Sequence, residues 1–214
     1  MRIALFAIAF ATMFATKLLA DEFGYYRGRV VAEWLGDGRT MKLLEDFSYF
    51  DPGDEEWDAQ LGAIVDGASI PRFAWTIIGG PFEGKYRDAS VIHDVACDKE
   101  DRPWPKVHRA FYTGMLASGV GVIKAKIMYA AVYHFGPRWP LAVTEWVDIC
   151  DGDAPNGVQL CKRSANTLDQ RVPVRETAEN LTEFRFLEQL IELRENSASP
   201  LTLEQIEQFG DWRR

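Results

Sequence analysis

The order of the hydrophobic patterns along the chain constrains the fold more than any other feature. Residues 25–35 and 40–50 are rich in aromatic and β-branched side chains, and Gly-Asp-Gly-Arg at 36–39 separates them. Glycine tolerates the positive φ that tight hairpin turns require, so an antiparallel β-hairpin is expected here. From residue 86 onward the apolar residues instead recur at helical spacing. Strands followed by helices predict an α+β fold.

The remaining elements follow from the same patterns. The acidic residues 51–58 indicate a loop, and residues 60–65 a short third strand. Helices are expected at 86–98, 106–117, 122–135, 177–196 and 203–209. A single α+β domain, with an N-terminal antiparallel hairpin or small sheet followed by packed helices, would then span residues 21–145. A polar loop at 146–176 would separate it from a peripheral C-terminal helical tail, residues 177–214.

The first twenty residues have the character of a secretory signal peptide. A basic residue near the start, an apolar stretch at 3–14 and a small residue, Ala20, precede the acidic pair at 21–22. The apolar stretch is too short to span a bilayer comfortably. We therefore expect a periplasmic or secreted protein with no stable membrane span after cleavage, and an uncleaved anchor is the alternative. In an oxidising compartment Cys150 and Cys161 could form a disulfide in the polar loop.

The net charge of the chain argues against one class of partner, nucleic acid. Acidic residues outnumber basic ones 32 to 24, which gives a formal net charge of −8. Proteins that bind the phosphate backbone usually carry a basic surface. Nucleic acid is therefore not expected as a partner.

Two of the three histidines mark the candidate site. His93 and Asp94 are neighbours in an otherwise apolar helical segment, and their side chains point about 100° apart. His108 lies on the next helix, with Tyr112 one turn later on the same side. If the two helices pack together, His93, Asp94 and His108 could form a catalytic group or ligate a divalent metal.

Two glycine-containing segments precede these helices. Residues 66–71, Asp-Gly-Ala-Ser-Ile-Pro, form either a structural turn that docks Trp75 or a site loop in which Asp66 and Ser69 support the histidines. Residues 79–84, Gly-Gly-Pro-Phe-Glu-Gly, expose backbone carbonyls of the kind that bind a hard cation such as calcium.

The order of these motifs resembles a known family. The segments 66–71, 91–94 (Val-Ile-His-Asp), 107–112 (Val-His-Arg-Ala-Phe-Tyr) and 130–139, together with Trp75, resemble the bacterial and phage family called domain of unknown function 1353. The resemblance covers about residues 26–140. Many members of that family carry Asp at the position of His108, which implies a polar role there. The family implies a fold but no activity.

A second resemblance suggests a chemistry. A glycine loop, a His-Asp helix and a facing polar helix are similar to secreted calcium-dependent phospholipases. That resemblance implies His93 as base, Asp94 and carbonyls near Gly79 and Gly80 as calcium ligands, and His108 as the group that orients His93. The cofactor would be a divalent cation, calcium or zinc, with Asp94 and His93 as its protein ligands.

Two functions remain open on the sequence. The first is an exported hydrolase that acts on a cell-envelope ester or amide, in phospholipid or peptidoglycan, through His93, Asp94 and His108. The second is a non-catalytic structural or interaction module that binds an envelope or phage protein. The hydrolase requires the two imidazoles to face an open cleft, whereas the module predicts that these polar groups are hydrogen-bonded and closed to solvent.

Overall fold

The computed structural model describes residues 22–67, 69–80, 82–140, 146–150, 161–165 and 177–209. The expected signal peptide, residues 1–20, lies outside them. No helix among the described residues has the length and apolar character needed to cross a membrane.

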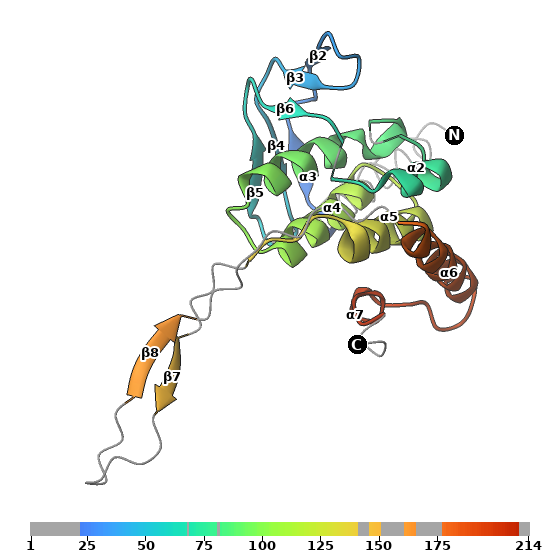
Figure 1. The fold of residues 1–214 in the computed structure, drawn as a ribbon. Helices are drawn as coiled ribbons and strands as arrows, with labels where there is room; N and C mark the ends of the chain where they lie inside the picture. The colour runs from blue at the N-terminus through green and yellow to red at the C-terminus, as the bar shows by residue number, and fades with distance from the viewer. Residues whose placement is uncertain are drawn as a thin grey trace, which may run out of the picture.

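Two small antiparallel sheets form the N-terminal part of the fold (Figure 1). The first sheet has the order β1-β4-β5 and the second the order β2-β3-β6. Their strands are β1 (Tyr25–Arg27), β2 (Ala32–Trp34), β3 (Met41–Leu43), β4 (Phe47–Phe50), β5 (Glu56–Ala59) and β6 (Ile64–Val65). The predicted hairpin is present where β2 pairs with β3, but β1 pairs with β4 in the other sheet.

The acidic segment after β4 differs from its prediction. Residues 51–58 were expected to be a loop, yet β5 begins at Glu56 and pairs with β4. Trp57 and Ala59 are buried, and Glu56 and Asp58, which alternate with them along the strand, are more accessible. This alternation is the period of a half-buried strand, and the acidic residues obscured it.

Helices cover the sheets and then one another in successive layers. They are α2 (Arg72–Ile78), the short 3-10 helix η1 (Gly84–Tyr86), α3 (Arg87–Lys99), α4 (Trp104–Ala117), α5 (Val122–Phe135), α6 (Ala178–Glu195) and α7 (Leu203–Glu207). Helix α3 packs on β5 and β6 and against α4, α4 packs against α5, and α5 against α6 (Figure 1). Helix α2 was not predicted, whereas α5 has the predicted bounds.

The C-terminal helices form the outer layer of the helical core. On α6 the side chains of Phe184, Leu187 and Ile191 are buried, and their spacing of three and four residues places them on one face of the helix predicted at 177–196. Lys126 of the apolar helix α5 is also buried, and its ammonium group pairs with the carboxylate of Glu195 at the end of α6. A buried charge needs such a partner, so this ion pair and the apolar face together fix α6 on α5.

A third pair of strands lies in the segment expected to be a polar loop. The strands β7 (Trp146–Cys150) and β8 (Cys161–Ala165) are antiparallel, and their register places Cys150 opposite Cys161. This hairpin lies away from the sheets and helices in Figure 1. The disulfide between the two cysteines stays a prediction.

Candidate functional site

The structure brings His93 and His108 into direct contact between α3 and α4. His93 Nε2 lies 2.8 Å from His108 Nδ1. Both side chains are buried, with exposed fractions of 1% and 0%. The contact follows from the predicted packing of the two helices, because each helix presents its histidine on the face turned to the other.

The hydrogen bonds around the pair fix where each proton resides. His108 Nε2 lies 3.2 Å from the carbonyl oxygen of Pro137, which can only accept, so this nitrogen donates. A neutral His108 then accepts at Nδ1, and His93 donates to it from Nε2. The sulfur of Cys97, one turn after His93 on α3, is 3.6 Å from Nε2 and 4.0 Å from Nδ1 of His93.

Burial keeps both imidazoles neutral. Desolvation lowers the pKa of His93 to about 3. It also lowers the pKa of His108 well below its usual value, and the neighbouring His93 and Arg138 act in the same direction. Aromatic rings complete the enclosure. The ring centroid of Phe111 lies 4.6 Å from that of His93, and the ring centroid of Trp104 lies 5.6 Å from that of His108. The pair is therefore a closed polar contact inside an apolar layer.

Asp94 turns to the loop that follows β6. Its Oδ2 accepts hydrogen bonds from the backbone N–H groups of Asp66, at 2.8 Å, and Gly67, at 3.0 Å. The side chain of Ser69 adds a further hydrogen bond, while burial raises the pKa of Asp94 above its usual value. The 100° between helical neighbours thus separates the two groups: His93 meets α4, and Asp94 anchors the loop at 66–69.

The other predicted site residues are placed as follows. The carboxylate of Asp66 is partly exposed and lies 3.7 Å from the guanidinium of Arg39. Tyr112 is half-buried and packs on Tyr129, with ring centroids 5.7 Å apart. The carbonyl of Gly80, expected near a cation, accepts a hydrogen bond of 2.7 Å from the hydroxyl of Tyr86. Asp94 and the glycine loop are thus each engaged with other protein groups.

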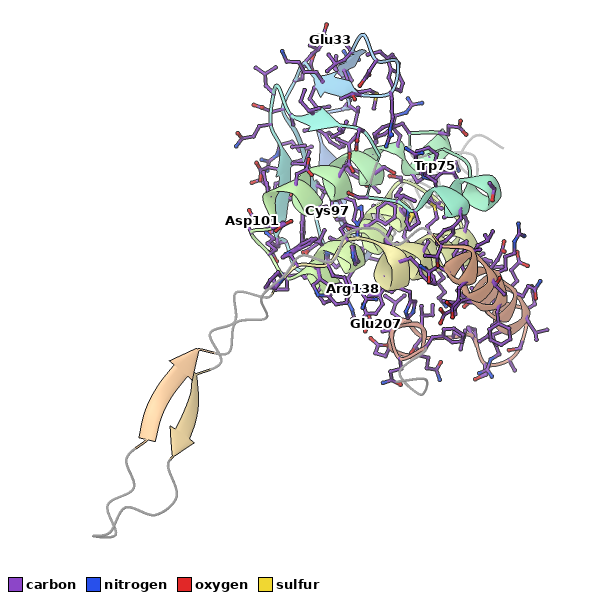
Figure 2. The ribbon with its side chains drawn as sticks, in the orientation of Figure 1. Glu33, Trp75, Cys97, Asp101, Arg138 and Glu207 are labelled. Atoms are coloured by element: carbon purple, nitrogen blue, oxygen red, sulfur yellow. The ribbon has the colours of Figure 1, made fainter. Side chains whose placement is uncertain are left out.

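An open cleft, which the sequence did not predict, lies beside Asp66. Its volume is about 390 Å³, and its lining residues come from the β2–β3 hairpin, the loop after β6, α2 and the glycine loop: Trp34, Gly38, Arg39, Asp66, Trp75, Gly80, Phe82 and Glu83. Trp75, labelled in Figure 2, is held by a hydrogen bond of 3.2 Å from its indole N–H to the carbonyl of Ile70. Ile70, near the end of the segment 66–71, therefore docks Trp75, in agreement with the predicted structural turn.

Trp34 is the signal that could have located this cleft. It lies on β2 next to the turn at 36–39, and 60% of it is exposed. Its ring meets that of Phe82 edge-on, at 6.4 Å between centroids. A large aromatic side chain is costly to leave in water, so an exposed tryptophan in a short strand often marks a binding surface.

Comparison with known proteins identifies the family. A family model described as a protein of unknown function, DUF1353, matches residues 41–132. The uncharacterized protein y4iH of Sinorhizobium fredii is 35% identical over 176 residues, which cover 82% of this chain and 72% of that protein. This chain belongs to the DUF1353 family.

A second relative extends the comparison. The DUF1353 chain is 42% identical over 144 residues to the uncharacterized protein y4jT of the same organism, a match that covers 66% of this chain. The match covers only 43% of y4jT itself. No solved structure matches the chain.

Proposed function

We propose that this protein is a non-catalytic binding module of the bacterial cell envelope, with its ligand held in the cleft beside Asp66. One contrast carries the proposal: the two histidines are closed to solvent, whereas the cleft lined by Asp66, Trp75 and the glycine loop is open. A reacting group must reach its substrate. Closed and hydrogen-bonded imidazoles fit a structural role better than a catalytic one. The envelope location rests on the sequence of residues 1–20.

The side chains of the cleft suggest a saccharide as the ligand. Trp34 and Trp75 offer aromatic surfaces, on which the apolar face of a sugar ring can stack, and the mostly buried Phe82 adds apolar lining. Asp66 and Glu83 offer carboxylate oxygens for hydroxyl groups, and Arg39 offers donors. Apolar surface with a few convergent polar groups is the usual composition of a small-ligand site. Peptidoglycan is the saccharide polymer of the compartment that we propose.

The buried site supports the cleft from inside. Asp94 holds the backbone of Asp66 and Gly67, and Ile70 holds the indole of Trp75. A binding site gains precision when hydrogen bonds behind it fix its walls. Asp94 would then serve the binding site without touching the ligand, while His93 contacts α4.

Binding to purified peptidoglycan and to the soluble oligosaccharide chitotetraose tests this proposal. Trp34→Ala should weaken binding at least tenfold, measured by sedimentation with sacculi and by titration calorimetry. Leu61→Ala is the matched control, because Leu61 is equally exposed, at 64%, and does not line the cleft. Equal binding by the wild-type protein and the Trp34 variant, or binding by neither, would refute the proposal.

The hydrolase is the second candidate, and the contact between His93 and His108 favours it. Two imidazoles 2.8 Å apart can orient and relay a proton. This function requires an opening motion that admits substrate to the pair. Release of fatty acid from phospholipid vesicles or of peptides from sacculi, lost in a folded His93→Gln variant, would support the hydrolase over the binding module.

A further inference from the structure

Three metal-binding atoms converge in the closed layer between α3 and α4. They are Nε2 of His93, Nδ1 of His108 and Sγ of Cys97, and the ligand atoms of the three residues lie within 4.8 Å of one another. All three side chains are buried. We propose that these atoms form a three-coordinate site for one monovalent copper ion. The proposal goes beyond the binding function above and does not depend on it.

One ligand distance already matches that of a metal site, and a second requires a small shift. With metal–nitrogen and metal–sulfur bonds of about 2.0 and 2.3 Å, neighbouring ligand atoms in a trigonal site lie about 3.5–3.7 Å apart. The sulfur of Cys97 is already 3.6 Å from Nε2 of His93. The two histidine nitrogens are 2.8 Å apart and would separate by about 0.7 Å as their hydrogen bond gives way to two metal bonds.

Two ligand atoms carry protons that must leave before the metal binds, and each proton has a destination. The proton on His93 Nε2 moves to Nδ1 of the same ring, which frees Nε2 as a ligand. The thiol of Cys97 loses its proton to solvent, so one proton is released for each ion bound. His108 keeps its proton on Nε2 and its hydrogen bond to the Pro137 carbonyl. A ligating histidine usually donates its other N–H in this way, so its orientation is already set.

Charge selects a monovalent ion. A thiolate, two neutral imidazoles and Cu⁺ make a neutral complex, whereas Zn²⁺ would leave a net positive charge in a closed apolar layer, which is costly. Arg138, labelled with Cys97 in Figure 2, adds a positive field at His108 and opposes any further positive charge. Asp94 does not join the three ligands, because its carboxylate points to the loop after β6, where Oδ2 accepts hydrogen bonds from the backbone N–H groups of Asp66 and Gly67.

The type and number of ligands also favour Cu⁺ over Zn²⁺. Thiolate and imidazole are ligands that Cu⁺ accepts. Structural zinc sites are almost always four-coordinate. Within the described part of the chain, the cluster of metal-competent side chains comprises only these three residues.

Anaerobic titration of the full chain with Cu⁺, in competition with the chromogenic chelator bicinchoninate, tests the site. The wild-type protein should bind one ion, with release of one proton. Cys97→Ser should weaken the affinity at least 100-fold. His134→Gln is the matched control: His134 is a partly buried histidine on α5 whose Nε2 lies 2.7 Å from the Ile206 carbonyl, outside the cluster. It should leave Cu⁺ affinity unchanged.

X-ray absorption of the copper-loaded wild-type protein identifies the atoms bound to copper, and it tests the site even if the variants fail to fold. One sulfur and two nitrogen neighbours are expected. Copper without a sulfur neighbour, no binding above that of the Cys97 variant, or tighter binding of Zn²⁺ than of Cu⁺ would each overturn the proposal. Saccharide binding by the metal-free protein is measured separately, so failure of one proposal leaves the other standing.

Discussion

Replacing Asp94 with alanine is expected to destabilise the protein through the loop at 66–69. The carboxylate accepts two backbone hydrogen bonds, from Asp66 and Gly67, and a further one from Ser69. Alanine would leave the buried N–H group of Gly67 and the partly buried N–H group of Asp66 without their acceptor, at about 1–3 kcal/mol each, or about 2–6 kcal/mol in sum.

Burial of the carboxylate offsets part of this cost. The raised pKa of Asp94 shows that desolvation outweighs the hydrogen bonds it receives. For an acid, a raised folded-state pKa means that stability falls as the pH rises above the unfolded value of 3.8. At neutral pH, removing the carboxylate therefore also removes an unfavourable contribution. We expect a net loss of about 2–3 kcal/mol for Asp94→Ala, at the lower end of the sum.

Asp94→Asn is the matched control. Its amide oxygen can still accept from both N–H groups and carries no charge to desolvate, so its stability should lie within about 1 kcal/mol of wild type. Urea denaturation at pH 7 measures both variants, and amide hydrogen exchange at Gly67 reports the loop directly. Equal loss in the two variants, or retained protection at Gly67 in Asp94→Ala, would refute the role assigned to this carboxylate.

Three further predictions concern the packing of the helices. Gly114→Ala should lower the free energy of unfolding by about 1–3 kcal/mol, although alanine has the better helix propensity, because an added Cβ would lie 2.8 Å from the hydroxyl oxygen of Tyr26. Adding Tyr26→Phe to this variant should restore much of the melting temperature. Phe184→Ala should cost about 3–5 kcal/mol in urea denaturation, whereas Phe186→Ala on the exposed side of α6 should cost less than about 1 kcal/mol. Burial raises the pKa of Tyr112 to about 12 from an ordinary value of 10.0. The contribution of the neutral phenol to stability is therefore present below pH 10 and lost as the pH rises through 12. Between pH 9 and pH 11, the midpoint of urea denaturation should fall less in Tyr112→Phe than in the wild-type protein.

The helices could be predicted from the sequence because their signals are local. The apolar spacing and the Gly-Pro stop at 136–137 determine the extent of α5, and the structure has the same bounds. The face of α6 that carries Phe184 and Ile191 is likewise set by residues three and four apart. Strand pairing is not local, so the long strand expected at 25–35 is divided between β1 in one sheet and β2 in the other.

The candidate site shows the same division. The sequence predicted that His93 and His108 could meet if their two helices packed together, and the structure places them in contact between α3 and α4. Only the tertiary structure decided that the pair is closed to solvent, since Phe111 and Trp104 of α4 and the backbone of Pro137 enclose it. It also decided that Asp94 faces the loop at 66–69 and that a cleft opens beside Asp66. Exposure depends on which distant segments cover a residue, and that information lies in the packing of the whole chain.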